Sequence, residues 1–360
     1  MKIFLCLVAI IGTAIPNLAQ EWMARYDDSK GDDYASAIAV DNLGNVYVTG
    51  SVRDSTIGED HLTIKYNSSG IQEWLARYGN DSSVITNKDK AYAIAVDNSG
   101  NTYIAGTSCN PGTAEDCATL KYNASGDIVW VARYDGSIHN SDEAFAIAID
   151  GQRNVYITGW SSDPTLAYLT IKYDSSGAQR WTARYDGPDY EDKATAIAVD
   201  GQGNVYVTGW SYSSYTSAAY ATIKYNSSGD SVWIARYDGG QDDIANAIAV
   251  DSTGYVYVTG TSEGTSNFDY ATVKYNPSGG QEWVKRYNGP GHAGDEARAI
   301  AADNSGYVYV TGMSNGLGTG LDYATIKYSV VGVEENEGLE IKDWGLEVYP
   351  NPCFGAVQIK

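Results

Sequence analysis

Residues 89–134 read DKAYAIAVDNSGNTYIAGTSCNPGTAEDCATLKYNASGDIVWVARY, and this stretch decides the fold because the chain repeats it six times. The motif W-x-x-R-Y ends each unit and recurs about every fifty residues. Its tryptophans are Trp22, Trp74, Trp130, Trp181, Trp233 and Trp283. A period of this length with four short apolar segments per unit is typical of a propeller blade.

The quoted unit contains four segments with strand character. Residues 91–96 alternate alanines with Tyr, Ile and Val, which predicts a strand with its alanines on one face. TYIAGTS, ATLKY and IVWVARY follow as further strands, and the Asn-Ser-Gly and Ala-Ser-Gly steps between them are turn sequences. The unit therefore predicts a four-stranded antiparallel sheet.

The predicted fold is an all-β, six-bladed β-propeller of four-stranded antiparallel blades over residues 21–330. We expect the alanine-rich strand to be innermost, because small side chains let neighbouring sheets approach closely near the axis, and the tryptophan strand to be outermost. Residues 21–26 then provide the missing fourth strand of the last blade beside residues 322–329 and close the ring. The expected state is a monomer.

The N-terminal residues 1–20 resemble a secretory signal, with Lys2 before an apolar run and cleavage near residues 14–19. The apolar run is too short for a comfortable membrane span, so we expect a secreted or cell-surface protein and not a transmembrane one. The net charge of −21 argues against nucleic acid as a partner. In an exported chain, Cys109 and Cys117 are expected to form a local disulfide, and two free buried thiols are the alternative.

With these motifs aligned, the chain resembles the bacterial SBBP-type β-propeller repeat family, whose phrases look like D-x-A-x-A-I-A-V-D, D-x-x-G-N-V-Y-V-T-G and K-Y-N-x-x-G-x-x-x-W. The resemblance covers residues 21–329 and implies an exported or surface protein without agreed catalytic residues. The family name refers to seven blades, whereas this chain has six full units. Residues 331–345 look like an acidic linker, and residues 346–360 resemble the start of a type IX secretion C-terminal sorting domain through Y-P-N-P.

Two sets of aspartates recur in step with the repeat. One set follows the inner strand and opens a D-x-x-G turn, where the carboxylate is expected to accept backbone N–H bonds: Asp41, Asp97, Asp150, Asp200, Asp251 and Asp303. The other set precedes the inner strand: Asp33, Asp89, Asp142, Asp192, Asp243 and Asp295. Hydrogen-bonded or ion-paired caps between blades are the favoured interpretation of this second set, and a metal site for Ca²⁺ or another cation is the alternative. No other cofactor is expected.

The segments between the second and third strands differ from repeat to repeat, whereas the glycine turns stay nearly constant. Strand direction places all the variable segments on one face of the disc, and recognition usually lies in loops on a rigid scaffold. The candidate ligand-binding residues are aromatic side chains of these segments: Trp160, Trp210, Tyr212, Tyr215, Phe268 and Tyr190. Packing of Trp160 and Trp210 on the next blade is an equally weighted interpretation.

The sequence therefore predicts a secreted or surface binding module for a glycan or a protein. A structural envelope or adhesion scaffold is the alternative, and a polysaccharide-acting enzyme is the third interpretation. Catalysis is not expected, because the three histidines occupy non-equivalent loops without metal-ligand spacing and no nucleophile elbow or phosphate-binding loop is present.

Overall fold

The computed structural model describes residues 20–28, 30–54, 58–79, 88–109, 114–188, 191–214, 217–264, 267–303 and 305–329. The proposed signal before residue 20, the linker and the sorting-type tail lie outside these residues. The described strands form six antiparallel sheets, of which five have four strands and the last has three.

The strands follow the repeat in chain order. Blades 1 and 2 contain β1 (Asp33–Val40), β2 (Val46–Asp54), β3 (Gly58–Tyr66), β4 (Gln72–Tyr78), β5 (Lys90–Val96), β6 (Thr102–Cys109), β7 (Glu115–Tyr122) and β8 (Ile128–Tyr134). Blades 3 and 4 contain β9 (Asp142–Ile149), β10 (Val155–Ser162), β11 (Leu166–Tyr173), β12 (Gln179–Tyr185), β13 (Asp192–Val199), β14 (Val205–Ser214), β15 (Ser217–Tyr225) and β16 (Ser231–Tyr237). Blades 5 and 6 contain β17 (Asp243–Val250), β18 (Val256–Glu263), β19 (Phe268–Tyr275), β20 (Gln281–Tyr287), β21 (Glu296–Ala302), β22 (Tyr307–Gly316) and β23 (Gly320–Ser329).

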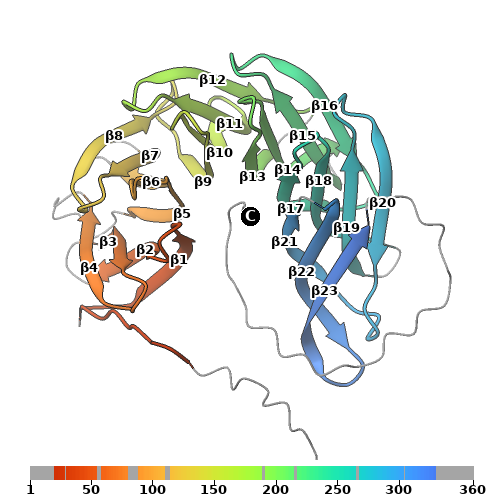
Figure 1. The fold of residues 1–360 in the computed structure, drawn as a ribbon. Helices are drawn as coiled ribbons and strands as arrows, with labels where there is room; N and C mark the ends of the chain where they lie inside the picture. The colour runs from red at the N-terminus through yellow and green to blue at the C-terminus, as the bar shows by residue number, and fades with distance from the viewer. Residues whose placement is uncertain are drawn as a thin grey trace, which may run out of the picture.

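The blades stand side by side around a common centre (Figure 1). The alanine-rich strands β1, β5, β9, β13, β17 and β21 lie closest to that centre, and the tryptophan strands β4, β8, β12, β16 and β20 lie at the periphery. Each inner strand also packs against the inner strand of the next blade. The predicted order of strands within a blade is therefore confirmed.

A β-bulge in every inner strand corrects the expected arrangement of its faces. Ala91 pairs with Gly106 and Ala93 with the adjacent Ala105, so Tyr92 is an extra residue in the ladder. Because Gly106 and Ala105 point to opposite faces of the sheet, so do Ala91 and Ala93. The alanines do not form the single row that unbroken alternation predicts. The bulge also explains the invariant glycine opposite it, because a Cβ on Gly106 would lie 1.9 Å from the Lys90 carbonyl oxygen.

The hydrophobic core lies between blades, where small side chains such as alanine pack among larger apolar and aromatic ones. Between blades 1 and 2, Ala37 and Tyr47 pack against Ala91, Ile94 and Leu120. The outer-strand tryptophan extends over the next blade. Trp74 packs against Tyr122, with ring centroids 6.0 Å apart, and a Cβ on Gly126 would lie 2.8 Å from the indole. Burial of these apolar surfaces holds neighbouring blades together.

The D-x-x-G turns form as the sequence predicts, and in the turn after Asp150 the glycine position is taken by Arg153 with φ of 65°. Asp200 Oδ1 accepts hydrogen bonds from the backbone N–H groups of Gln202 and Asn204, and its Oδ2 accepts one from the Tyr206 hydroxyl at 3.0 Å. The other five aspartates of this set make the same three kinds of contact: Asp41, Asp97, Asp150, Asp251 and Asp303. The buried tyrosine of the second strand thus fixes the turn to the core of its own blade.

The expected closure by residues 21–26 is not present in this structure. The described residues 20–28 form no strand, and β23 is the outer edge of the three-stranded sheet. The described blades form an open arc with β1 at one end and β23 at the other (Figure 1). Trp22 packs instead on Tyr66 of blade 1, with ring centroids 6.0 Å apart and planes at 33°. Trp74 makes the same contact with Tyr122, also at 6.0 Å and 33°.

The expected disulfide is wrong for this structure, in which Cys109 and Cys117 are both free. Cys109 lies opposite Glu115 in the ladder, and Cys117 lies opposite Thr107. The two cysteines are therefore diagonal neighbours, whose Cα atoms are typically about 7–8 Å apart in an antiparallel pair. A disulfide needs a Cα separation below about 6.8 Å, so this register does not suit one.

Candidate functional site

The face that carries the variable segments also carries the beginnings of the inner strands. Each blade is an antiparallel meander, so the connection from β14 to β15 lies at the same end as the first residues of β13. The D-x-x-G turns lie at the opposite end. We call these the variable face and the turn face. The described candidates Trp160, Trp210, Tyr212 and Phe268 belong to the variable face.

Lys193 brings two of the predicted aromatic residues together. It is the second residue of β13, and its Nζ lies 5.1 Å from the ring centroid of Trp160 and 5.6 Å from that of Trp210. Trp210 also makes an edge contact with Tyr212 at 5.5 Å. A cation placed over aromatic faces is attracted by their quadrupoles, so Lys193 links blades 3 and 4 at this point. We call Trp160, Lys193, Trp210 and Tyr212 the Lys193 patch.

The members of the patch differ in accessibility. Trp160 is 9% exposed, so the packing interpretation holds for most of its surface. Lys193, Trp210 and Tyr212 are half-buried and present part of their surface to solvent. The accessible part of the patch therefore combines an indole, a phenol and an ammonium group.

A carboxylate stands near this ammonium group. Burial raises the pKa of Glu143 on β9, Glu115 raises it further, and Lys193 and Lys90 lower it. Lys90 in turn forms an ion pair with Glu59, with Nζ and the carboxylate oxygen 3.1 Å apart. Acidic and basic groups thus alternate along the inner strands of blades 2 to 4 on the variable face.

Of the predicted aromatics that the structure describes, Phe268 lies apart from the Lys193 patch. Phe268 begins β19 in blade 5 and is 36% exposed, and the ring contacts of the Lys193 patch do not include it. Tyr190 and Tyr215 lie outside the described residues. Trp160, Trp210 and Tyr212 are the three candidates that the described structure brings together.

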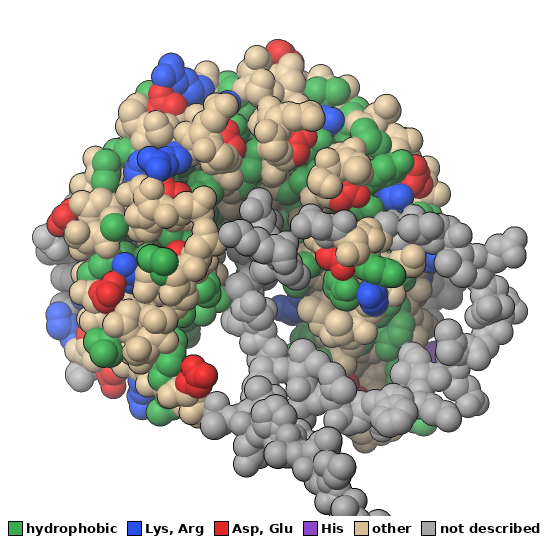
Figure 2. All heavy atoms as spheres, viewed as in Figure 1, with side chains coloured by type: hydrophobic (Ala, Val, Ile, Leu, Met, Phe, Trp, Pro, Cys, Tyr) green, Lys and Arg blue, Asp and Glu red, His purple; other side chains and the backbone are tan. Residues whose placement is uncertain are grey.

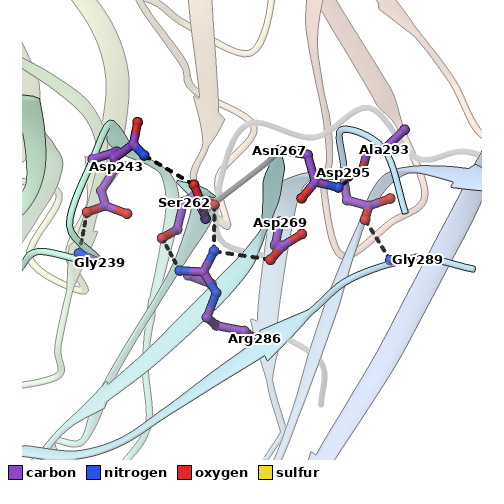
Figure 3. A network of polar contacts seen from close by, with 12 residues as sticks. Gly239, Asp243, Ser262, Asn267, Asp269, Arg286, Gly289, Ala293 and Asp295 are labelled. Atoms are coloured by element: carbon purple, nitrogen blue, oxygen red, sulfur yellow. Dashed lines mark hydrogen bonds and ion pairs between the residues drawn. The ribbon is translucent and has the colours of Figure 1, made fainter. Parts of the chain in front are cut away.

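The aspartates that precede the inner strands act as caps. The backbone N–H of Gly289 donates to Asp295 Oδ2 at 2.6 Å, and that of Asn315 donates to Oδ1 at 2.8 Å. Asp243 accepts from the Gly239 N–H, as Figure 3 shows. The equivalent aspartates accept backbone N–H bonds as well: Asp33, Asp89, Asp142 and Asp192. Each carboxylate thus binds backbone groups near its own strand, which supports the capping interpretation.

Burial raises the pKa of the Asp243 cap, and the positive charge of the repeating Arg286 acts against that shift. Arg286 donates to Ser262 Oγ at 2.6 Å and pairs with Asp269 at 3.1 Å (Figure 3). Arg236 likewise donates to Ser211 and to the Tyr185 hydroxyl of the preceding blade. The outer-strand arginine therefore joins two blades through hydroxyl groups. Among the described residues, the sole group of three acids with converging carboxylate oxygens that contains a cap is Asp116, Asp135 and Asp142.

Sequence reasoning missed Lys193 and Glu143, although the repeats carry the signal. The second residue of the D-x-A motif takes four identities across the six blades, while the Asp before it and the Ala after it are fixed: Tyr34, Lys90, Glu143, Lys193, Ile244 and Glu296. Variation at this inner-strand position on the variable face indicates a position whose side chain the scaffold does not specify.

Charged side chains of both signs are interspersed with apolar and uncharged ones on the face that Figure 2 shows. Among the described residues, no helix has the length and apolarity to cross a membrane.

The radial four-stranded blades define a propeller-type repeat protein. The SBBP beta-propeller repeat matches residues 21–51, 73–111, 130–164, 180–216, 232–269 and 282–318, which together make up more than half of the chain. The chain belongs to this family.

Solved structures and curated sequences add little to that assignment. A gluconolactonase from Xanthomonas campestris is similar, with a TM-score of 0.40, 10% identity, and coverage of 79% of this chain and 84% of that one. A putative gluconolactonase of a structural genomics programme has a TM-score of 0.38, 11% identity, and coverage of 83% and 90%. No curated protein matches the sequence. Likeness at this level carries no argument about activity.

Proposed function

We propose that this protein is an exported binding module that recognises a glycan through its variable face. The observation that carries the proposal is the Lys193 patch, in which Trp210 and Tyr212 present aromatic surface beside the Lys193 ammonium group. Sugar rings stack on aromatic faces, and an ammonium group binds carboxylate or sulfate substituents. An acidic polysaccharide fits this combination best.

A glycan array with the full-length protein tests this proposal. We expect binding to at least one acidic glycan, and a loss of at least tenfold in affinity for Lys193→Met, which keeps the aliphatic stem and removes the charge. Lys172→Met is the matched control, because Lys172 also lies over an aromatic ring, 5.2 Å from the Tyr156 centroid, but contacts Ser227 in a turn of the opposite face. Absence of binding to any glycan, or equal losses in both variants, would contradict the proposal.

A structural scaffold is the second candidate function, and the burial of Trp160 favours it. If both indoles serve to pack Lys193 between blades, Lys193→Met should lower the thermal transition temperature without changing any binding. The array and a melting curve on the same variant therefore separate the two functions.

We further propose that residues 21–26 close the ring by pairing with β23. The contact between Trp22 and blade 1 already matches the one that every outer-strand tryptophan makes with the blade that follows it. The Lys-to-Trp register of the complete blades, such as Lys274 opposite Trp283, places Trp22 opposite Lys327. In this closed form the Y-P-N-P segment after the ring serves export, as its resemblance to sorting domains implies.

The exposed surface of blade 6 supports this closure. Tyr323 on β23 is 75% exposed, whereas the equivalent Tyr168, Tyr220 and Tyr270 of blades 3 to 5 are fully buried, and the neighbouring Leu321 is 63% exposed. An uncovered edge strand with apolar side chains invites association, and a paired fourth strand would remove that edge.

A further inference from the structure

A glutamate and a lysine adjoin the same tryptophan on the variable face. Glu143 is the second residue of β9 and lies directly opposite Trp160 in the antiparallel ladder. Residues placed in this way have Cβ atoms about 4.5–5.5 Å apart, so their side chains are neighbours. Lys193 reaches the same indole from blade 4, with Nζ 5.1 Å from the ring centroid. One acidic and one basic group therefore meet at the junction of blades 3 and 4.

The other charged side chains near Glu143 neutralise one another in two ion pairs. Lys90 Nζ lies 3.1 Å from a carboxylate oxygen of Glu59, and Lys88 Nζ lies 3.6 Å from one of Glu115. Both lysines lower the pKa of Glu143 through space, and Glu115 raises it. Because each lysine already has a glutamate as its partner, neither is a dedicated counter-ion for Glu143.

Glu143 and Lys193 both keep bonding capacity that the fold does not use. Among the described residues, the Glu143 carboxylate accepts no hydrogen bond and forms no ion pair, and the Lys193 ammonium group lies over two indoles without an ion pair. Both side chains are half-buried, so each presents part of its surface to solvent. Burial raises the pKa of Glu143. Half-buried charged groups without a protein partner are completed by water or by a ligand.

The repeats indicate that the scaffold does not require a glutamate at this position. Tyrosine, lysine and isoleucine occupy it in other blades. Blade 6 also has a glutamate there, and Glu296 forms an ion pair with Arg298 of its own strand at 3.0 Å. A glutamate without an ion pair at this position is thus a feature of blade 3, where it stands beside the Lys193 patch.

We propose that Glu143 determines which acidic glycan the variable face accepts, and that this glycan carries uronic acid units and not several sulfate groups per sugar. The inference rests on the proposed function of the Lys193 patch. A single uronic acid carboxylate binds the Lys193 ammonium group, a sugar ring stacks on the accessible surface of Trp210 and Tyr212, and hydroxyl groups of the glycan donate to Glu143. A multiply sulfated sugar has fewer hydroxyl donors and brings negative charge beside Glu143, which disfavours its binding.

Affinities of the full-length protein for two probes of matched length, an oligogalacturonate and a dextran sulfate oligosaccharide, test this inference. They are measured at constant ionic strength and at about pH 8, far above the ordinary pKa of a carboxyl group, so that Glu143 is ionised. We expect the wild type to bind the oligogalacturonate more tightly. Glu143→Gln keeps an acceptor oxygen and removes the charge, so it should shift the ratio of the two affinities toward dextran sulfate by at least about fivefold. Circular dichroism checks that the variant is folded.

Glu296→Gln is the matched control, because it changes the net charge by the same amount at the same repeat position of blade 6. It should leave the ratio of affinities as in the wild type. Tighter binding of dextran sulfate by the wild type, an unchanged ratio in Glu143→Gln, or an equal shift in both variants overturns this inference and leaves the glycan-binding proposal standing. Binding of neither probe also overturns it, and the proposed function fails as well only if the array shows no acidic glycan.

Discussion

Two kinds of contact position the single residues discussed above: hydrogen bonds between residues close in the sequence, and packing contacts between different blades. The aspartates of the D-x-x-G turns could be predicted, because their hydrogen bonds join residues two to four positions apart. The Lys193 patch could not, because its contact with Trp160 joins different blades and depends on how they pack. The same limit applies to Asp116 and Asp142, which converge across a blade junction.

His61 is the residue whose burial predicts a pH effect. It is 1% exposed, its Nε2 contacts the Thr107 carbonyl at 2.7 Å, and its ring packs on the edge of Tyr78. Because a carbonyl only accepts, Nε2 carries the hydrogen. Burial lowers the pKa of His61 below 6.5, while the Thr107 carbonyl and Asp89 act against that shift. The folded protein therefore holds a neutral histidine that the unfolded chain protonates near pH 6.5.

We expect the free energy of unfolding to fall as the pH drops below about 6.5, with a slope approaching about 1.4 kcal/mol per pH unit from this one group. The sign follows because folding lowers the pKa of His61. Below the pKa of the unfolded chain, the unfolded state binds a proton that the folded state does not, so a falling pH favours unfolding. His61→Tyr reproduces the residue that blades 3 to 5 carry, as in Tyr168, and should flatten this part of the profile. Urea unfolding between pH 7.5 and 5 measures the free energy of unfolding at each pH. An unchanged pH dependence in His61→Tyr would contradict this role for His61.

At the scale of elements, the strands and their order within a blade could be predicted from period and turn chemistry. The bulges could not, because alternating Ala and larger residues fit an unbroken ladder equally well. One extra residue moves Ala93 to the face opposite Ala91 and brings an alanine to both sides of the inner strand. The disulfide prediction failed for a related reason, because two cysteines near one hairpin can be diagonal and not opposite.

The proposed closing strand makes an element-scale prediction. The Ala271-to-Arg286 pairing of blade 5 places Arg25 opposite Ala324 in the closed ring. The double variant Arg25→Cys and Ala324→Cys should therefore form a disulfide under mild oxidation, detected as a cross-linked peptide by mass spectrometry. The pair Arg25→Cys and Ile326→Cys, two residues out of register, is the control and should cross-link far less. Equal yields from both pairs, or none from the first, would indicate that the ring stays open.

At the scale of the whole molecule, the fixed positions build the scaffold, and we propose that the variable positions serve recognition. The constant positions build the turns, the hydroxyl-bonded arginine links and the tryptophan contacts between blades. The variable positions lie on the loops and on the strand ends beside them. The six-unit repeat could be predicted in full from the sequence. A ligand could not, because the repeated residues reveal the scaffold that all blades share, whereas a ligand site depends on the residues that differ between blades.

Comparing one substitution on each face of blade 4 tests this division most directly. Trp210 lies in the Lys193 patch, and the exposed Gln202 lies in the D-x-x-G turn of the turn face. The measurement is the calorimetric affinity of the wild type, Trp210→Ala and Gln202→Ala for the glycan that binds most tightly on the array. We predict that Gln202→Ala keeps the wild-type affinity and that Trp210→Ala loses at least tenfold, or about 1.4 kcal/mol. Equal affinities in both variants, with circular dichroism showing both to be folded, would contradict the account.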